Sequence, residues 1–357
     1  MNAKLPILAA ALLALSSSQR PPADKGLKDY YQKYFPIGVA VSARALQDPA
    51  EAALIVQQFN SLTPENDMKM GPIHPEENRY NWGPADAIVD FAQAHKLRVR
   101  GHNLCWHEQT PKWLFKDAAG NPVSKEVLLK RLHDHIDTVV KRYKGKLYAW
   151  DVVNEAISDD PKQFLRNSDW YKICGEDFIA EAFRYAHAAD PKAVLFYNDY
   201  NTERPEKRER IYKLLKKLVD AKVPIDAVGL QGHWSLYEPT EQELRSTIER
   251  FASLGLKVQV TELDVSVYPW EKDRRAKRAG ESDAYTPEMQ QKQSAQYKMF
   301  FKVFRDEAKY LTGVTFWNIS DHYTWLDTYP VEGRKNYPLL FDEQYKPKAA
   351  YYEVVKF

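Results

Sequence analysis

The chain has 357 residues, of which 44% are hydrophobic and 13% aromatic, a composition typical of a globular protein with a large core. Its 51 Lys and Arg residues nearly balance 49 Asp and Glu residues, which leaves a formal net charge of +2 at pH 7. This balance argues against a protein whose main partner is a nucleic acid or an anionic membrane surface.

The first 18 residues have the pattern of an export signal. Lys4 supplies a positive start, Leu5–Leu15 is apolar, and Ser16–Ser18 are small residues suited to cleavage. The apolar segment is too short to span a bilayer. We therefore expect a signal peptide over residues 1–18, a polar linker over residues 19–24, and a periplasmic or extracellular protein without a membrane anchor.

The rest of the chain alternates between short apolar runs and longer segments with helical periodicity. The apolar runs, which we predict to be strands, cover residues 36–43, 61–66, 97–106, 147–155, 192–201, 226–234, 256–265 and 311–321. Eight strands, each followed by a helical segment, predict a parallel sheet closed into a single (β/α)8 TIM barrel. Because no repeat or linker interrupts it, residues 25–357 are predicted to form one catalytic domain.

Residues 124–143 are predicted to form an amphipathic helix between the third and fourth strands. The apolar residues expected near one of its faces are Val127, Leu128, Leu132 and Ile136. Ser124 and Thr240 are predicted helix N-caps, and Gly255 is a predicted stop.

The active site of such a barrel lies at the C-terminal ends of its strands. Seven predicted strand ends carry polar or aromatic groups: Glu65-Asn66, His102-Asn103, Asn154-Glu155, Asn198-Asp199-Tyr200, Gln231-His233-Trp234, Glu262-Asp264 and Trp317-Asn318. Solvation alone explains one such pair, but the whole set indicates a hydrogen-bonding cleft edged with aromatic rings.

Two of these strand ends carry a glutamate. Glu155 is predicted to end the fourth strand and Glu262 the seventh, on opposite sides of one barrel mouth. Cleavage of a glycosidic bond needs such a pair, one to protonate the leaving oxygen and one to stabilise or attack the oxocarbenium-like carbon. Asn154 is placed to bind the 2-hydroxyl of the sugar. Spacing alone leaves open that both glutamates form ordinary salt bridges.

Seven motifs resemble those of glycoside hydrolase family 10, the endo-β-1,4-xylanases, in order along the whole mature chain. They are TPENDMKM (63–70), GHNLCWHEQTPKW (101–113), WDVVNEA (150–156), YNDYN (197–201), GLQGHW (229–234), TELDV (261–265) and YKPKAAYY (345–352).

This resemblance implies a retaining double displacement without a cofactor or metal. Glu155 would be the general acid/base, protonated among aromatic and apolar neighbours, and Glu262 the nucleophile. His233 and Asp264 would form a hydrogen-bonded chain that keeps Glu262 ionised. The implied partners are xylan and xylo-oligosaccharides, and the protein would be a monomer.

The resemblance also implies the sugar contacts. The second sugar on the non-reducing side would be held by Glu65, Asn66 and Lys69. The sugar being cleaved would be surrounded by His102, Trp106, Asn154 and Gln231. Trp317 and Trp325 would wall the sugars on the non-reducing side, and Tyr200 would stack a sugar on the leaving-group side.

The chain departs from the family pattern at a few positions. Asn318 stands where the family usually has glycine, which puts the shape of the non-reducing side in doubt. Asn103 and Cys105 replace more usual residues behind the catalytic face. The charged segment 268–285 either extends the cleft or is mobile. Asn318-Ile319-Ser320 fits a glycosylation sequon, but at a strand end we interpret the match as chance.

The two cysteines, Cys105 in the third strand and Cys174 in the fourth helix, lie in elements that are not adjacent. Even in an exported protein we therefore expect two separate buried thiols rather than a disulfide.

Other functional classes fit the sequence less well. His102 and His107, and the pair His133 and His135 on an expected charged helix face, lack zinc-ligand spacing with a third partner. A serine hydrolase would need a G-x-S-x-G elbow, which the sequence lacks. A β-1,4-glucan-active glycosidase on the same barrel stays open, since the substrates differ by one hydroxymethyl group per sugar. A non-catalytic polysaccharide-binding barrel is disfavoured because Glu155 and Glu262 are both present.

Overall fold

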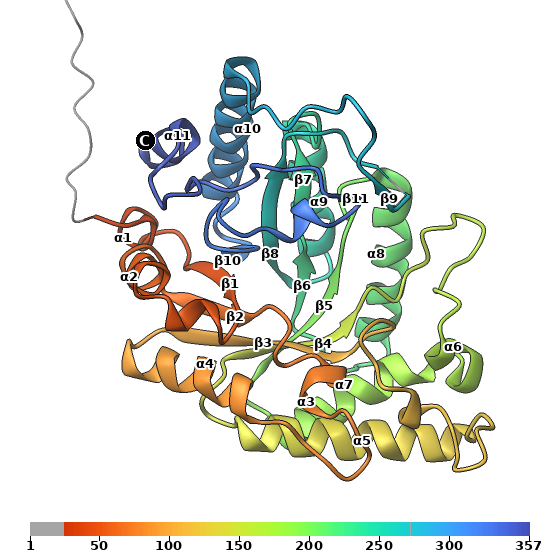
Figure 1. Ribbon diagram of the computed structural model, residues 1–357. Helices are drawn as coiled ribbons and strands as arrows, with labels where there is room; N and C mark the ends of the chain where they lie inside the picture. The colour runs from red at the N-terminus through yellow and green to blue at the C-terminus, as the bar shows by residue number, and fades with distance from the viewer. Residues whose placement is uncertain (1–24, 272) are drawn as a thin grey trace, which may run out of the picture.

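The computed structural model describes residues 25–271 and 273–357, and its centre is a closed barrel of parallel strands (Figure 1). The predicted signal peptide and linker lie outside the described residues. The barrel strands are β1 (Ile37–Val41), β2 (Ser61–Pro64), β3 (Arg98–Cys105), β4 (Ala149–Asn154), β5 (Val194–Asp199), β6 (Ala227–Leu230), β8 (Lys257–Ser266) and β10 (Leu311–Phe316). Each pairs with the next, and β10 pairs with both β1 and β8, which closes the ring. The predicted (β/α)8 barrel is confirmed.

Helices surround the barrel on the outside (Figure 1). They are α1 (Leu27–Tyr30), α2 (Pro49–Gln58), α3 (Met70–Ile73), α4 (Gly83–Ala94), α5 (Lys125–Arg142), α6 (Asp169–Cys174), α7 (Asp177–Ala189), α8 (Pro205–Asp220), α9 (Glu241–Ala252), α10 (Pro287–Asp306) and α11 (Ala349–Val355). Short 3-10 turns are η1 (Ala45–Gln47), η2 (Lys112–Leu114) and η3 (Trp325–Asp327). Ser124 and Thr240 cap α5 and α9 as predicted, and Gly255 ends the turn after α9 with a φ of +81°.

The buried face of α5 differs from the prediction at two residues. Leu128, Leu132 and Ile136 are buried, but Val127 is 42% exposed because it lies one residue, about 100°, off their stripe. His135, expected on a charged face, is fully buried on that stripe.

His135 contacts a second buried imidazole. Its Nδ1 lies 3.1 Å from Nδ1 of His74, whose Nε2 lies 3.1 Å from the carbonyl oxygen of Glu77. Since a carbonyl only accepts, His74 carries its proton on Nε2 and accepts from His135 through Nδ1. Nε2 of His135 then has no hydrogen-bond partner among the described residues.

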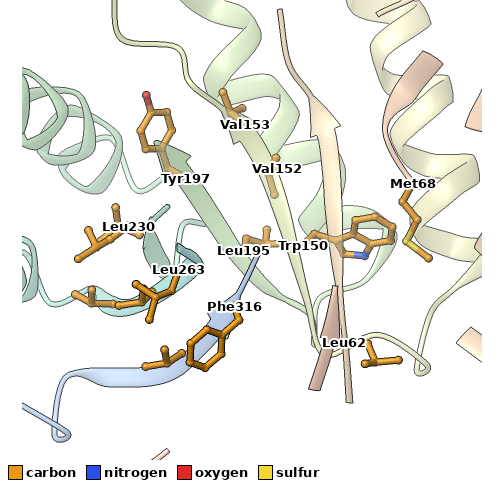
Figure 2. Close-up of a cluster of buried hydrophobic side chains, with 14 of the residues drawn as sticks. Leu62, Met68, Trp150, Val152, Val153, Leu195, Tyr197, Leu230, Leu263 and Phe316 are labelled. Carbon is orange, nitrogen blue, oxygen red and sulfur yellow. The ribbon is translucent and has the colours of Figure 1, made fainter. Parts of the chain in front are cut away.

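The main hydrophobic core lies between the strands and the surrounding helices. Successive side chains of a strand point to opposite faces, and the outward ones on β4 and its neighbours, such as Trp150, Val152 and Leu195, fill this layer (Figure 2). The inward residue between them, Asp151, instead lies inside the barrel and forms an ion pair with Arg100 at 2.5 Å. The barrel interior directly beneath the mouth therefore contains a buried charged pair.

One prediction about strand ends is wrong. Glu262 does not end its strand, because β8 continues to Ser266. A short extra strand, β7 (His233–Ser235), pairs with this outer part of β8 and brings His233 opposite Asp264. The extension of β8 carries Asp264 and pairs with the strand of His233, so it holds two of the predicted site residues above the barrel.

Cys105 and Cys174 are both buried and free, as predicted. Over residues 25–271 and 273–357, the structure contains no helix long and apolar enough to cross a membrane.

Candidate active site

A cleft of about 850 Å³ opens at the C-terminal ends of the strands and contains every site residue predicted from the sequence. These residues are Glu65, Asn66, Lys69, His102, Trp106, Asn154, Glu155, Tyr200, Gln231, His233, Glu262, Asp264, Trp317 and Trp325. The motifs therefore converge although they are spread over most of the chain.

Glu155 follows the last residue of β4 with a φ of +56°, which turns its side chain into the cleft. Its Oε2 accepts a hydrogen bond from the indole of Trp106 at 2.7 Å. Its Oε1 accepts from Gln231 at 2.7 Å and from Asn154 at 3.0 Å. The carboxyl group thus has one aromatic neighbour, as expected, but its other partners are amides rather than apolar groups.

Glu262 is buried on β8 between two donors. Asn198 donates to its Oε1 at 2.7 Å, and Nε2 of His233 lies 3.2 Å from its Oε2. Burial by itself raises the pKa of Glu262, but the electrostatic interactions with His102, His233 and Arg100 and the hydrogen bond from His233 outweigh it and hold this pKa at about 2. Glu262 is therefore charged at neutral pH.

A hydrogen-bonded chain leads outward from Glu262. Nδ1 of His233 lies 2.9 Å from Oδ2 of Asp264, and the indole of Trp325 donates to the same oxygen at 2.8 Å. Burial lowers the pKa of His233, but the Asp264 and Glu262 carboxylates more than offset this and raise it to about 10. The predicted chain of His233 and Asp264 is present, and its histidine is a cation that faces Glu262.

Asn198 joins the two glutamates. It was expected among the polar strand ends of the cleft, but no role was predicted for it. Besides Glu262, its side-chain nitrogen donates to Asn154 at 2.9 Å, and Asn154 in turn donates to Glu155. Gly229 on β6 makes room for it, because a Cβ there would lie 2.2 Å from Oδ1 of Asn198. Glycine opposite a strand-end asparagine is the sequence signal that could have found it.

The floor of the cleft is tied to the charged barrel interior. Nδ1 of His102 lies 2.7 Å from Oδ2 of Asp151, which also pairs with Arg100. His102 lies 4.0 Å from Glu262 and contacts the edge of Trp317, with 5.3 Å between ring centroids. Asp151 therefore acts on the cleft through His102, whereas Arg100 acts on Glu262 through its charge.

Glu65, Asn66 and Lys69 form one corner of the cleft, as predicted. Lys69 donates to Asn66 at 2.9 Å and lies 4.7 Å from the ring centre of Trp106. Burial lowers the pKa of Lys69, although Glu262, Glu65 and Glu155 partly oppose it. This corner offers donors and acceptors in a largely buried setting.

Tyr200 lies at the opposite end of the cleft in a network of charged side chains. Its hydroxyl donates to Asp159 and accepts from Arg166 at 2.9 Å, and the ammonium of Lys207 lies 3.5 Å from its ring centre. Arg166 also donates to the carbonyl oxygen of Glu155 at 3.1 Å. Tyr200 was predicted from the sequence, but the charged side chains that hold its ring in place were not.

The segment 268–285 extends the cleft on this side. Tyr268, Trp270 and Glu271 are among its lining residues. Farther along, β9 (Arg275–Ala276) pairs with β11 (Val331–Glu332), and Arg275 forms ion pairs with Glu271 and Glu281. Of the two readings of this segment, the structure supports the cleft extension.

Asn318 is 3% exposed, and its side-chain nitrogen and oxygen each form a hydrogen bond inside the protein. A buried amide cannot accept a glycan, so the sequon match is chance, as predicted. No group of three or more His, Cys, Asp or Glu in residues 25–271 and 273–357 could hold a metal ion.

A (β/α)8 barrel with two differently hydrogen-bonded carboxyl groups in an open, aromatic-lined cleft has the architecture of a glycoside hydrolase. The comparisons with known proteins give the particular family. The chain matches Glycosyl hydrolase family 10 over residues 26–357, and it belongs to this family.

Two relatives of this chain are similar to it over nearly their whole lengths. A β-1,4-xylanase of Dictyoglomus thermophilum is 50% identical, with 93% of this chain and 90% of the relative covered. An endo-1,4-β-xylanase of Geobacillus stearothermophilus is 48% identical, with 92% and 97% covered. The crystal structure of xylanase XynB from Paenibacillus barcinonensis, in complex with a conduramine derivative, superposes with a TM-score of 0.88 at 46% identity and covers 95% of this chain and 99% of that one.

Proposed function

We propose that the protein is an endo-β-1,4-xylanase that hydrolyses internal xylosidic bonds of xylan with retention of configuration. The observation that carries this proposal is a pair of glutamates with different hydrogen-bond partners that face one cleft. Glu262 is held charged by His233, while Glu155 faces the same cleft and is joined to it through Asn154 and Asn198. Two xylanases that are similar to this protein over more than 90% of its chain support the choice of substrate.

In the first step, Glu262 attacks the anomeric carbon while Glu155 donates its proton to the leaving oxygen, and a glycosyl-enzyme ester forms. Oε1 of Glu155 already accepts two N–H bonds, so we place the transferred proton on Oε2, beside Trp106. Protonated His233 keeps Glu262 ionised for the attack.

In the second step, Glu155, now a carboxylate, removes a proton from water, which attacks the anomeric carbon and releases Glu262. Asn154 uses one N–H for Glu155, and its second N–H is available for the 2-hydroxyl of the sugar. This bond strengthens in an oxocarbenium-like transition state.

The remaining roles are the ones that the resemblance to the family implies. Glu65, Asn66 and Lys69 bind the second sugar on the non-reducing side, and Tyr200 stacks a sugar on the leaving-group side. Trp317 and Trp325 form a wall (the tryptophan wall) against which a xylose ring fits and the hydroxymethyl group of glucose is crowded. Binding without catalysis, the alternative from another class, is disfavoured by the intact pair of glutamates.

We further propose that residues 1–18 export the protein and that it acts as a monomer outside the cytoplasm. The Lys4 start and the apolar segment Leu5–Leu15 support export. Mass spectrometry of the protein recovered from the periplasm and the medium tests export. A recovered chain that still begins at Met1 would refute the cleaved signal peptide. Light scattering at working concentration tests the monomer.

The decisive experiment is proton NMR of the anomeric signals early in the hydrolysis of a β-1,4-xylo-oligosaccharide, with the matched cello-oligosaccharide alongside. We expect β-anomeric products, with the cello-series slow. An α-anomeric first product would refute Glu262 as the nucleophile, since water would then attack directly. Faster cleavage of the cello-series would leave the mechanism intact and overturn the substrate.

A further inference from the structure

Asn318 adopts a backbone conformation that its side chain disfavours. It follows Trp317 just after β10, and its φ is +100°, in the region that favours glycine. Such strain persists only where the surrounding contacts require it, and it concentrates at functional sites. The position therefore calls for glycine on backbone grounds, and an asparagine there must be explained by its side chain.

The carboxamide of Asn318 bridges two other segments of the chain. Its Nδ2 donates to Oε2 of Glu65 at 3.0 Å, and its Oδ1 accepts from the backbone N–H of Trp325 at 3.3 Å. Glu65 follows β2 and Trp325 begins η3, so the amide links the end of β2 to the start of η3. A glycine at this position would supply neither contact.

Glu65 depends on this bridge because it is 5% exposed. Burial raises its pKa, which the charge of Lys69 and the hydrogen bonds from Asn318 and Tyr323 oppose. The bond from Tyr323 is long at 3.4 Å, whereas the bond from Asn318 is of ordinary length. Asn318 thus supplies the better of these two donors and fixes the direction in which the carboxylate presents its free lone pairs.

We propose that Asn318 is a positioning residue for the second sugar on the non-reducing side. It orients Glu65 toward the hydroxyls of that sugar and pins the backbone of Trp325, so that the tryptophan wall and the carboxylate keep a fixed separation. This inference rests on the proposed function, since it names a determinant of binding within the same cleft.

Two substrates separate this role from a purely structural one. An aryl β-xyloside has one sugar on the non-reducing side of the cleaved bond, and an aryl β-xylobioside has two, so only the second substrate reaches Glu65. For Asn318→Gly we expect KM for the xylobioside to rise about 10-fold with kcat unchanged, which is the effect of losing one hydrogen bond to a charged group. The kinetics on the xyloside should stay within about 2-fold of the unaltered protein.

Two further variants sharpen the test. Asn318→Asp keeps the shape but turns a carboxylate toward Glu65, so its KM for the xylobioside should exceed that of Asn318→Gly at neutral pH and recover at acid pH, where a shared proton restores a donor. Lys222→Gly is the matched control, because Lys222 also has a positive φ, +55°, but is an exposed residue after α8. Its KM values should not change.

The outcomes distinguish a failure of the proposed role of Asn318 from a failure of the proposed function. Equal losses on both substrates, or no loss on either, would overturn the role of Asn318. Failure of the unaltered protein to cleave either xyloside would overturn the proposed function instead. A single cooperative thermal transition of Asn318→Gly above the assay temperature shows that the variant folds.

Discussion

Replacing His233 by asparagine should move the acid limb of activity to higher pH. The asparagine amide coincides with the Nδ1 side of the imidazole, so the contact with Asp264 is kept while the one with Glu262 is lost. A hydrogen bond from a charged donor contributes about 1.5–3 kcal/mol, and at about 1.4 kcal/mol per pKa unit its loss raises a pKa by about 1 to 2 units. Glu262 would then titrate at about 3 to 4 instead of about 2.

The acid limb moves to higher pH because Glu262 attacks only as the carboxylate. The profile of kcat/KM against pH reports the free enzyme, so the variant should lose activity between about pH 5 and 3, where the unaltered protein retains its ionised nucleophile. His187→Asn, an exposed histidine on α7, is the matched control and should leave the profile unchanged. If the acid limb of His233→Asn coincided with that of the control, His233 would not be what keeps Glu262 charged.

Two other changes have outcomes fixed by the structure. Gly229→Ala should lower kcat/KM by about 10- to 100-fold and destabilise the fold by about 1–3 kcal/mol, because the new Cβ displaces Asn198 from Glu262. Steady-state kinetics measure the first effect and urea unfolding the second. Wild-type values in both would refute the bridging role of Asn198. Burial and the electrostatic interaction with His74 lower the pKa of His135 to about 3, so stability should fall as pH drops from about 6.5 toward 3. His135→Gln should flatten that part of the curve in urea unfolding at a series of pH values, and an unchanged slope would refute it.

The sequence was sufficient for the barrel and for a set of residues that all line the cleft. Strand runs and helix caps are local signals, so residues such as Ser124 and Thr240 could be assigned from their neighbours alone. The site could be located because strand ends of a barrel converge whatever lies between them. What the sequence motifs did not contain was the pairing geometry that gives each side chain its partner.

The predictions that were wrong or missing failed because the pairing geometry is not contained in local sequence. Nothing local to Glu262 shows that its strand continues to Ser266, since β7, which pairs with the extension, is a separate segment. His135 lies among charged residues in the sequence, but helix rotation sets it on the buried stripe against His74. The charges around Tyr200 come from loops and helices far apart along the chain, and only the folded structure brings them together.

The buried pair of Arg100 and Asp151 beneath the mouth has a consequence for attempts to make the protein more heat-resistant. Nε of Arg100 and Oδ1 of Asp151 have no hydrogen-bond partner among the described residues, and well-packed apolar replacements of such pairs often stabilise a fold by about 1–4 kcal/mol. The same replacement would remove the guanidinium that helps to keep Glu262 ionised and the carboxylate that orients His102. A screen for thermostability would therefore select changes at this pair that a screen for turnover rejects, and the barrel interior marks where the two engineering goals conflict.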